Sequence, residues 1–186
     1  FYGYMHGAAP LHVQFNLNDS SIFIVNQTLF DANNLSVEAQ LFDLHGNKSG
    51  QQKFELDIPS NTTQTAGFLN VSQKPKGLCF VRFLLKDNEG NLMDENLYWL
   101  TDKKSDMQDL EKLESALLQI DITENQNGTK EVLIKNTGNE TAFFTRLKLK
   151  NTKTNKLELP IFLEDNYITL FPGEEKKIEI ELPHWD

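Results

Sequence analysis

The chain has 186 residues, of which 39% are hydrophobic and 24% are charged, so it can bury a core and is too apolar for wholesale disorder. Its formal net charge is −9, and no run of Lys or Arg exceeds two consecutive residues. We therefore expect neither nucleic-acid binding nor attachment to an anionic membrane, because both need a positive surface. No stretch approaches the ~20 apolar residues that span a bilayer, so we expect no membrane insertion.

The first hundred residues alternate between apolar and polar side chains, with turn residues every eight to twelve positions. This pattern predicts seven short strands and is typical of an immunoglobulin-like sandwich. The expected strands cover residues 12–17, 21–26, 36–44, 52–58, 66–71, 78–85 and 95–100. We assign residues 1–102 to this first sandwich and interpret residues 1–11 as a lead-in from an upstream domain.

The pattern changes in residues 103–117, where Met107, Leu110, Leu113 and Leu117 recur at roughly helical spacing. Either of the polar residues at 105–106 is a suitable helix cap. This stretch predicts a linker or short helix between two domains.

Alternation resumes at Leu118 and predicts a second, smaller sandwich over residues 118–186. Its expected strands cover residues 118–122, 130–136, 142–150, 157–163, 167–171 and 176–182. The predicted fold class is therefore all-β, with two tandem immunoglobulin-like β-sandwich domains. The scarcity of helical patterns excludes an α/β enzyme fold.

No constellation of residues predicts catalysis, cofactor binding or a metal centre. Cys79 lies in an apolar run and is expected to be a buried core residue, since a single cysteine cannot form an intrachain disulfide. Three adjacent carboxylate pairs are expected on solvated faces or turns, because neighbours on a strand point to opposite faces. These pairs are Asp94-Glu95, Glu164-Asp165 and Glu174-Glu175. The histidines lack metal-ligand spacing; they are His6, His12, His45 and His184.

Tyr98 and Trp99 are adjacent in an expected strand, so their rings should lie on opposite faces of the sheet. One ring can enter the core while the other meets solvent or a partner. Because exposed rings also stack on sugars, a carbohydrate-binding module remains an alternative interpretation. An immunoglobulin-like stalk of a bacterial cell-surface adhesin or protease is another.

Several segments resemble the C-terminal part of glycoside hydrolase family 2 enzymes. The exit from the catalytic barrel is matched by Phe1-Tyr2-Gly3 and by residues 9–16, and residues 21–28 and 96–100 resemble the sandwich that follows. A second sandwich is matched by residues 136–138, 142–144 and 165–174. The nearest resemblance is to exo-β-glucosaminidases and β-mannosidase-like members, including mannosylglycoprotein endo-β-mannosidases.

The resemblance implies that the chain is an accessory, non-catalytic piece of a retaining β-glycosidase with two catalytic glutamates. Those glutamates would lie in an upstream barrel of the same polypeptide, and no residue here matches them. The parent is then expected in the periplasm or secreted, in a bacterium. Contacts with another domain or with the rim of the active site are expected at Tyr98, Trp99, Asp165, Asn166 and Tyr167.

Overall fold

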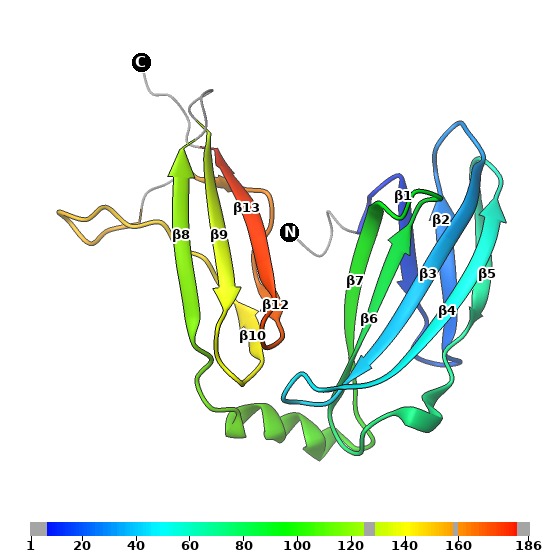
Figure 1. The fold of residues 1–186 in the computed structure, drawn as a ribbon, viewed down its shortest axis with the longest axis horizontal. Coiled ribbons are helices and arrows are strands. Elements are labelled where there is room, and N and C mark those ends of the chain that lie inside the picture. The colour runs from blue at the N-terminus through cyan, green and yellow to red at the C-terminus, as the bar shows by residue number, and fades with distance from the viewer. Residues whose placement is uncertain (1–6, 125–128, 158–159, 182–186) are drawn as a thin grey trace. The chain divides into compact units, whose positions relative to one another are not determined.

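The computed structural model describes residues 7–124, 129–157 and 160–181, and the chain divides into two compact units, Phe1–Lys112 and Leu113–Asp186. The described residues form thirteen strands and two short 3-10 helices (Figure 1). The predicted all-β class is confirmed. None of the helices in the described ranges is long and apolar enough to cross a membrane.

The described part of unit 1 holds seven strands in two antiparallel sheets. Its elements are β1 (Leu11–Phe15), β2 (Ser21–Asn26), β3 (Ala32–Phe42), β4 (Lys48–Ile58), β5 (Thr62–Phe68), η1 (Val71–Gln73), β6 (Cys79–Lys86), β7 (Leu92–Leu100) and η2 (Lys104–Lys112). One sheet has the order β1-β2-β5 and the other β4-β3-β6-β7 (Figure 1). The helix η2 lies within the stretch for which the sequence predicts a linker or short helix.

Every second residue of the central strands faces the core of unit 1, as the alternation predicts. Val13 is paired with Ile24 on β2, and Val37 with Leu85 on β6. Phe83 is fully buried among them, and its ring centroid lies 5.0 Å from that of Phe15. Burying one such side chain contributes roughly 1.5–3 kcal/mol, so this apolar layer is the main force that holds the two sheets together.

The outer edge of β1 is closed by side chains of β7 rather than by another strand. Val13 donates its backbone N–H to Asp94 Oδ2 at 2.8 Å, and Asn96 Nδ2 donates to the Val13 carbonyl at 3.2 Å. Phe15 donates its N–H to the Tyr98 hydroxyl oxygen at 3.2 Å. The three β7 side chains lie opposite the core residues of β6, so they reach β1 through the interior of the sandwich. The unpaired backbone groups of β1 are thereby satisfied without a ladder.

Asp94 corrects the expectation that all three adjacent carboxylate pairs lie on solvated faces or turns. Its side chain is buried, and its neighbour Glu95 lies on the opposite face of β7. The interior position is tolerated because the carboxylate accepts a backbone hydrogen bond from β1.

Unit 2 holds six strands within its described residues. They are β8 (Leu118–Glu124), β9 (Lys130–Asn136), β10 (Ala142–Thr145), β11 (Phe162–Leu163), β12 (Ile168–Leu170) and β13 (Glu175–Glu181). The larger sheet has the order β11-β13-β9-β8, and β10 pairs with β12 in a second sheet. Its buried apolar residues include Ile134, Ile178, Ile168 and Leu170. This arrangement agrees with the predicted smaller sandwich.

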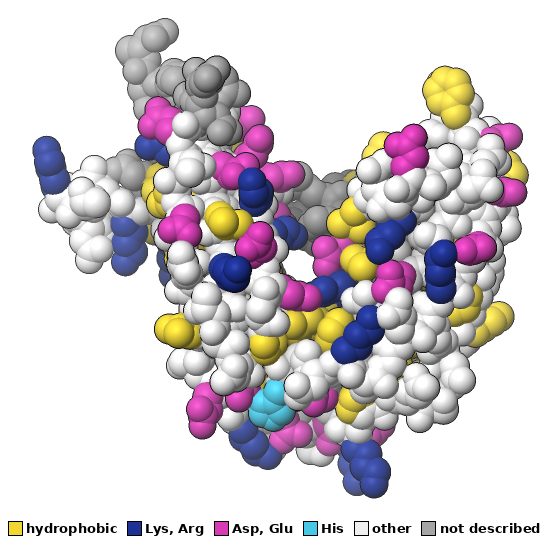
Figure 2. All heavy atoms as spheres, in the orientation of Figure 1, with side chains coloured by type: hydrophobic (Ala, Val, Ile, Leu, Met, Phe, Trp, Pro, Cys, Tyr) yellow, Lys and Arg dark blue, Asp and Glu magenta, His cyan; other side chains and the backbone are white. Residues whose placement is uncertain are grey.

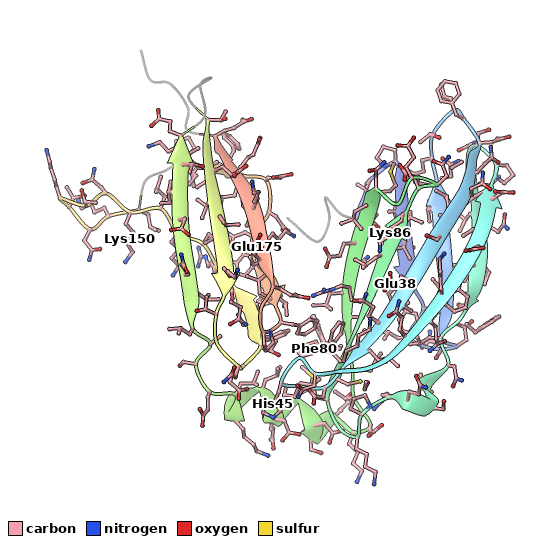
Figure 3. All side chains as sticks on the ribbon, in the orientation of Figure 1. Glu38, His45, Phe80, Lys86, Lys150 and Glu175 are labelled. Atoms are coloured by element: carbon pink, nitrogen blue, oxygen red, sulfur yellow. The ribbon has the colours of Figure 1, made fainter. Side chains whose placement is uncertain are left out.

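One strand predicted in unit 2 is shorter than the sequence indicates: the strand predicted over residues 142–150 ends at Thr145. Of the strand predicted over 157–163, residues 158–159 lie outside the described ranges, and the described part is a strand at Phe162–Leu163. The backbone N–H and C=O of Leu147 bond to the side chain of Asn166, which takes the place of a neighbouring strand. Residues 146–157 instead form a hairpin arm closed by one β-bridge between Lys150 and Leu157, and it projects from the sheets of unit 2 (Figures 1 and 3).

In each unit a buried asparagine ends a strand and makes a similar set of hydrogen bonds. Asn26 ends β2, and its amide donates to the carbonyls of Phe30 and Pro59 while its oxygen accepts from Thr28 N–H. Asn136 ends β9 and repeats this arrangement. Its amide donates to the carbonyls of Glu140 and of Leu170 on β12, and its oxygen accepts the N–H of Gly138.

We predict that Asp94→Ala lowers the free energy of unfolding of unit 1 by about 1–3 kcal/mol, since Val13 N–H would then be buried without its partner. Chemical denaturation followed by circular dichroism measures this change. Glu111→Ala removes a charge of the same sign from the exposed side of η2 and is expected to change stability by less than about 0.5 kcal/mol. Equal effects of the two substitutions would contradict the edge-closing role of Asp94.

Candidate functional site

The adjacent rings on β7 lie on opposite faces of the sheet, as predicted. Tyr98 packs edge-on against Phe15 and Phe83 in the core, with centroid distances of 5.5 and 5.9 Å. Burial raises the pKa of the Tyr98 phenol above its ordinary value, because ionisation would place a charge in the interior. Its hydroxyl is committed to β1, so Tyr98 serves the fold of unit 1.

Trp99 lies on the face of the four-stranded sheet that points away from the core, where it is partly exposed. It pairs across the ladder with Phe80, which is paired in turn with Phe42 on β3. The Arg82 guanidinium lies 5.3 Å from the centroid of Phe42, and its Nε is 3.0 Å from Glu95 Oε1. This outer face therefore combines aromatic rings with a charge that is already paired.

The segment Asp165–Tyr167 is a loop held by buried polar side chains. Asp165 and Asn166 are both buried. The pair Glu164-Asp165, expected on a solvated face or in a turn, lies in the loop between β11 and β12, with Asp165 buried. Asp165 Oδ2 accepts from Lys176 Nζ at 2.5 Å, and its Oδ1 accepts the Asn166 N–H at 2.7 Å. Asn166 Oδ1 accepts the backbone N–H groups of Leu147 and Tyr167 at 2.7 and 2.9 Å.

This polar network presents two aromatic rings on the surface of unit 2. Phe144 is 52% exposed and Tyr167 is 39% exposed, and their ring centroids lie 5.2 Å apart. The guanidinium carbon of Arg146 lies 5.7 Å from the centroid of Tyr167. Phe143 extends the group, with its centroid 5.6 Å from that of Phe144. We call Phe143, Phe144, Arg146 and Tyr167 the aromatic cluster.

The backbone under the aromatic cluster is strained. Phe144 and Tyr167 have φ angles of +53° and +59°, in the left-handed region that bulky residues rarely adopt. Between Ala142 and Thr145 the ladder with β12 contains a register shift, and Thr169 Oγ1 accepts the N–H of Phe144. Each such conformation costs of order 1–3 kcal/mol, and strain of this kind concentrates at functional sites. A bulge of this type re-aims side chains and so exposes Phe144.

The aromatic cluster can bind a flat or apolar surface and can donate hydrogen bonds through Arg146, but it offers no acid–base pair. Within the described residues no group of three or more potential metal ligands occurs. Cys79 is buried, and burial raises its thiol pKa, which disfavours the nucleophilic thiolate. Of the histidines, His6 and His184 lie outside the described residues, and His12 is buried beside the Ala9 carbonyl.

The sequence predicts contacts at Asp165, Asn166 and Tyr167, and Phe144 and Arg146 are not among the predicted contact residues. A Phe-Phe pair beside a strand end gives no local signal of a left-handed backbone. The spacing of Tyr167 from Phe144 is 23 residues, and only the pairing of β10 with β12 brings them together.

Surface charges elsewhere are mixed. Lys86 Nζ lies 3.0 Å from Glu38 Oε2 in unit 1 (Figure 3), and Lys177 Nζ lies 3.1 Å from Glu131 Oε1 in unit 2. On the face shown in Figure 2, the Lys and Arg side chains are largely interspersed with Asp and Glu. Ion pairs near the surface contribute little to stability, and at these positions the opposite charges lie side by side.

Family models match both units. The exo-β-D-glucosaminidase Ig-fold domain matches residues 96–186, and the mannosidase Ig/CBM-like domain matches residues 18–105. The predicted resemblance is therefore confirmed. Similar proteins include the exo-β-D-glucosaminidase of Arthroderma benhamiae, which is 24% identical over 98% of this chain and 23% of its own length. The mannosylglycoprotein endo-β-mannosidase of Lilium longiflorum is 25% identical over 99% of this chain and 26% of its length.

Solved structures show the same fold. The exo-chitosanase of Amycolatopsis orientalis superposes with a TM-score of 0.80 at 23% identity, covering 96% of this chain and 24% of that one. The β-D-mannosidase of Dictyoglomus thermophilum gives a TM-score of 0.74 at 21% identity, covering 98% and 21%. The chain thus spans about a quarter of the length of the curated relatives it matches. These relatives come from fungi, bacteria and a plant, so the likeness does not support the expected bacterial source in particular.

We predict that Asn166→Ala destabilises unit 2 by about 1–3 kcal/mol and releases the strained backbone at Tyr167, because the Leu147 and Tyr167 N–H groups lose their acceptor. Loss of nuclear Overhauser contacts between the rings of Phe144 and Tyr167 reports the release. Asn139→Ala, at an exposed position of the same unit, is the matched control and should leave these contacts in place. Retained ring contacts in Asn166→Ala would show that the network does not position the cluster.

We also predict that unit 1 loses stability above pH 10 in a manner that depends on Tyr98. The folded-state pKa is raised above the ordinary value of 10.0, so the folded state holds its proton more tightly than the unfolded chain. The resulting stability is present below pH 10 and is lost as the pH rises through the folded pKa. Urea midpoints measured from pH 8 to pH 11 should fall more steeply for the wild type than for Tyr98→Phe. Parallel curves would refute this contribution.

Proposed function

We propose that this chain, whose two units match the Ig-like domains of family 2 glycoside hydrolases, is a non-catalytic accessory region of a longer retaining β-glycosidase. The proposal rests on one observation: the two units, one after the other along the chain, match Ig-like domains of mannosidases and exo-glucosaminidases. The coverage of about a quarter of each relative leaves room for a catalytic barrel elsewhere in the parent.

The two buried carboxylates are both engaged in hydrogen bonds within the fold, which supports a non-catalytic role. Asp94 accepts from the backbone of β1, and Asp165 is bonded to Lys176 and to its own loop. A retaining glycosidase needs two carboxyl groups facing a cleft about 5–5.5 Å apart. Neither buried acid is available for that arrangement, so the two glutamates of the reaction would belong to the barrel.

The aromatic cluster gives the accessory role a specific contact. We propose that the loop Asp165–Tyr167 meets the barrel or the rim of its active site, as the resemblance implies. Strained, exposed rings on a rigid polar support are pre-organised for contact, which lowers the ordering cost of association. Trp99, on the outer face of unit 1, is a second proposed contact position. We propose an exported location for the parent.

We predict that the 186-residue chain alone does not hydrolyse aryl β-D-glucosaminides or aryl β-D-mannosides. In the parent, deleting the residues that correspond to this chain should lower the melting temperature and kcat while substrate cleavage still requires the barrel glutamates. Release of p-nitrophenol and thermal unfolding measure the two effects. Turnover by the isolated chain that persists through successive purification steps would overturn the assignment, as would a parent that lacks a (β/α) barrel.

A further inference from the structure

The hairpin arm, residues 146–157, carries a concentration of positive charge that the overall composition hides. It contains Arg146, Lys148, Lys150, Lys153 and Lys156 and no acidic residue. The arm thus holds five of the eighteen Lys and Arg residues and none of the twenty-seven Asp and Glu residues. The absence of Lys or Arg runs longer than two residues does not reveal this concentration, because the cations of the arm are spaced apart rather than consecutive.

The cations of the arm are exposed and have no carboxylate partner among the described residues. All four lysines are exposed, and among the described residues the structure gives none of their ammonium groups an ion pair. The stacking on Tyr167 is the one interaction of the Arg146 guanidinium within the described part of the chain. Elsewhere in unit 2, by contrast, Lys135, Lys176 and Lys177 each lie beside a carboxylate. Unpaired like charges repel one another, so the arm gains stability from an anionic ligand.

The cations lie on one line with the aromatic cluster. Exposed and half-buried residues alternate from Phe144 to Lys150, so Phe144, Arg146, Lys148 and Lys150 share the solvent side while the leucines between them lie on the other. The solvent side of this segment therefore presents an aromatic ring followed by three positive charges.

The tip of the arm is ordered by its own hydrogen bonds. Asn151 N–H donates to the Lys156 carbonyl at 2.9 Å, and Asn151 Oδ1 accepts from the N–H groups of Lys153 and Thr154. Asn155 occupies the left-handed region that such a turn requires. The last two lysines are thus held at the end of the charged line rather than on a loose loop.

We propose that the line Phe144–Arg146–Lys148–Lys150, extended by Lys153 and Lys156, binds an anionic β-linked polysaccharide. The ring stacks on one pyranose, the guanidinium donates a pair of hydrogen bonds to a carboxylate, and the ammonium groups meet the following charges. Arg146 suits this ligand because its planar fork matches a carboxylate. A protonated aminosugar is disfavoured, since five cations would repel it. The proposal rests on the proposed function only for the choice of a β-linked sugar.

The test uses the 186-residue chain and three oligosaccharides of equal length: β-1,4-linked mannuronate, mannose and glucosamine. We expect mannuronate to bind at least tenfold more tightly than neutral mannose, with no binding of glucosamine at pH 6. Raising NaCl from 50 to 200 mM should weaken mannuronate binding about tenfold, as expected for a contact made by several charges. Isothermal titration calorimetry gives the affinities, and amide shifts in 15N spectra locate the site.

The double variant K148E/K150E should abolish mannuronate binding, and F144A should weaken it several-fold while leaving its salt dependence unchanged. The matched control K103E/K104E makes the same charge change at two exposed lysines of unit 1 and should leave the affinity unchanged. Equal binding of mannose, an unaffected K148E/K150E variant, or a single-stranded DNA bound as tightly as mannuronate would overturn the proposal. The binding test uses the isolated chain without a barrel. Failure to bind mannuronate and failure of the hydrolysis predictions are therefore separate outcomes.

Discussion

The open edges of the sheets are the constraint on which this fold depends. A strand at the edge of a sandwich presents backbone N–H and C=O groups that lose free energy if they are buried without partners. The chain has one cysteine and cannot use a disulfide to hold its sheets together. In unit 1 the side chains of Asp94, Asn96 and Tyr98 span the gap and bond to the edge of β1. The two sheets are thereby fixed to each other at the side where neither ladder continues.

Buried amides solve the same problem wherever a ladder stops. Asn26 and Asn136 end strands in different units, and each amide replaces several backbone bonds at once. Asn166 does so at the candidate site, where it bonds both backbone groups of Leu147 in place of a strand. Because this amide satisfies the backbone locally, the neighbouring residues need not stay in the sheet. The strained exposure of Tyr167 and Phe144 is possible for that reason.

The sequence predicts those features that depend on local periodicity. Alternation places the core strands, and the adjacency of Tyr98 and Trp99 is enough to put them on opposite faces. The burial of Asp94 could not be predicted, because its partner Val13 is 81 positions away and lies in the other sheet. The left-handed backbone of Phe144 is equally invisible, since it results from the register shift between β10 and β12. Residues 147–150 alternate like a strand, but an amide side chain occupies the bonds that a strand would need.

Departures from regular strand geometry and from paired surface charge are concentrated in one part of unit 2. The left-handed aromatic residues, the strand that ends early at Thr145 and the cations of the arm all lie between Ala142 and Tyr167, whereas unit 1 follows its alternation closely. A sandwich needs none of these features to fold, and several of them lower its stability. These features suit a surface that makes contacts rather than one that packs in a core. The arm and the aromatic cluster share Arg146, so a partner that neutralises the cations would also meet the exposed rings. The two features are therefore best understood as one surface, with a charged end and an aromatic end.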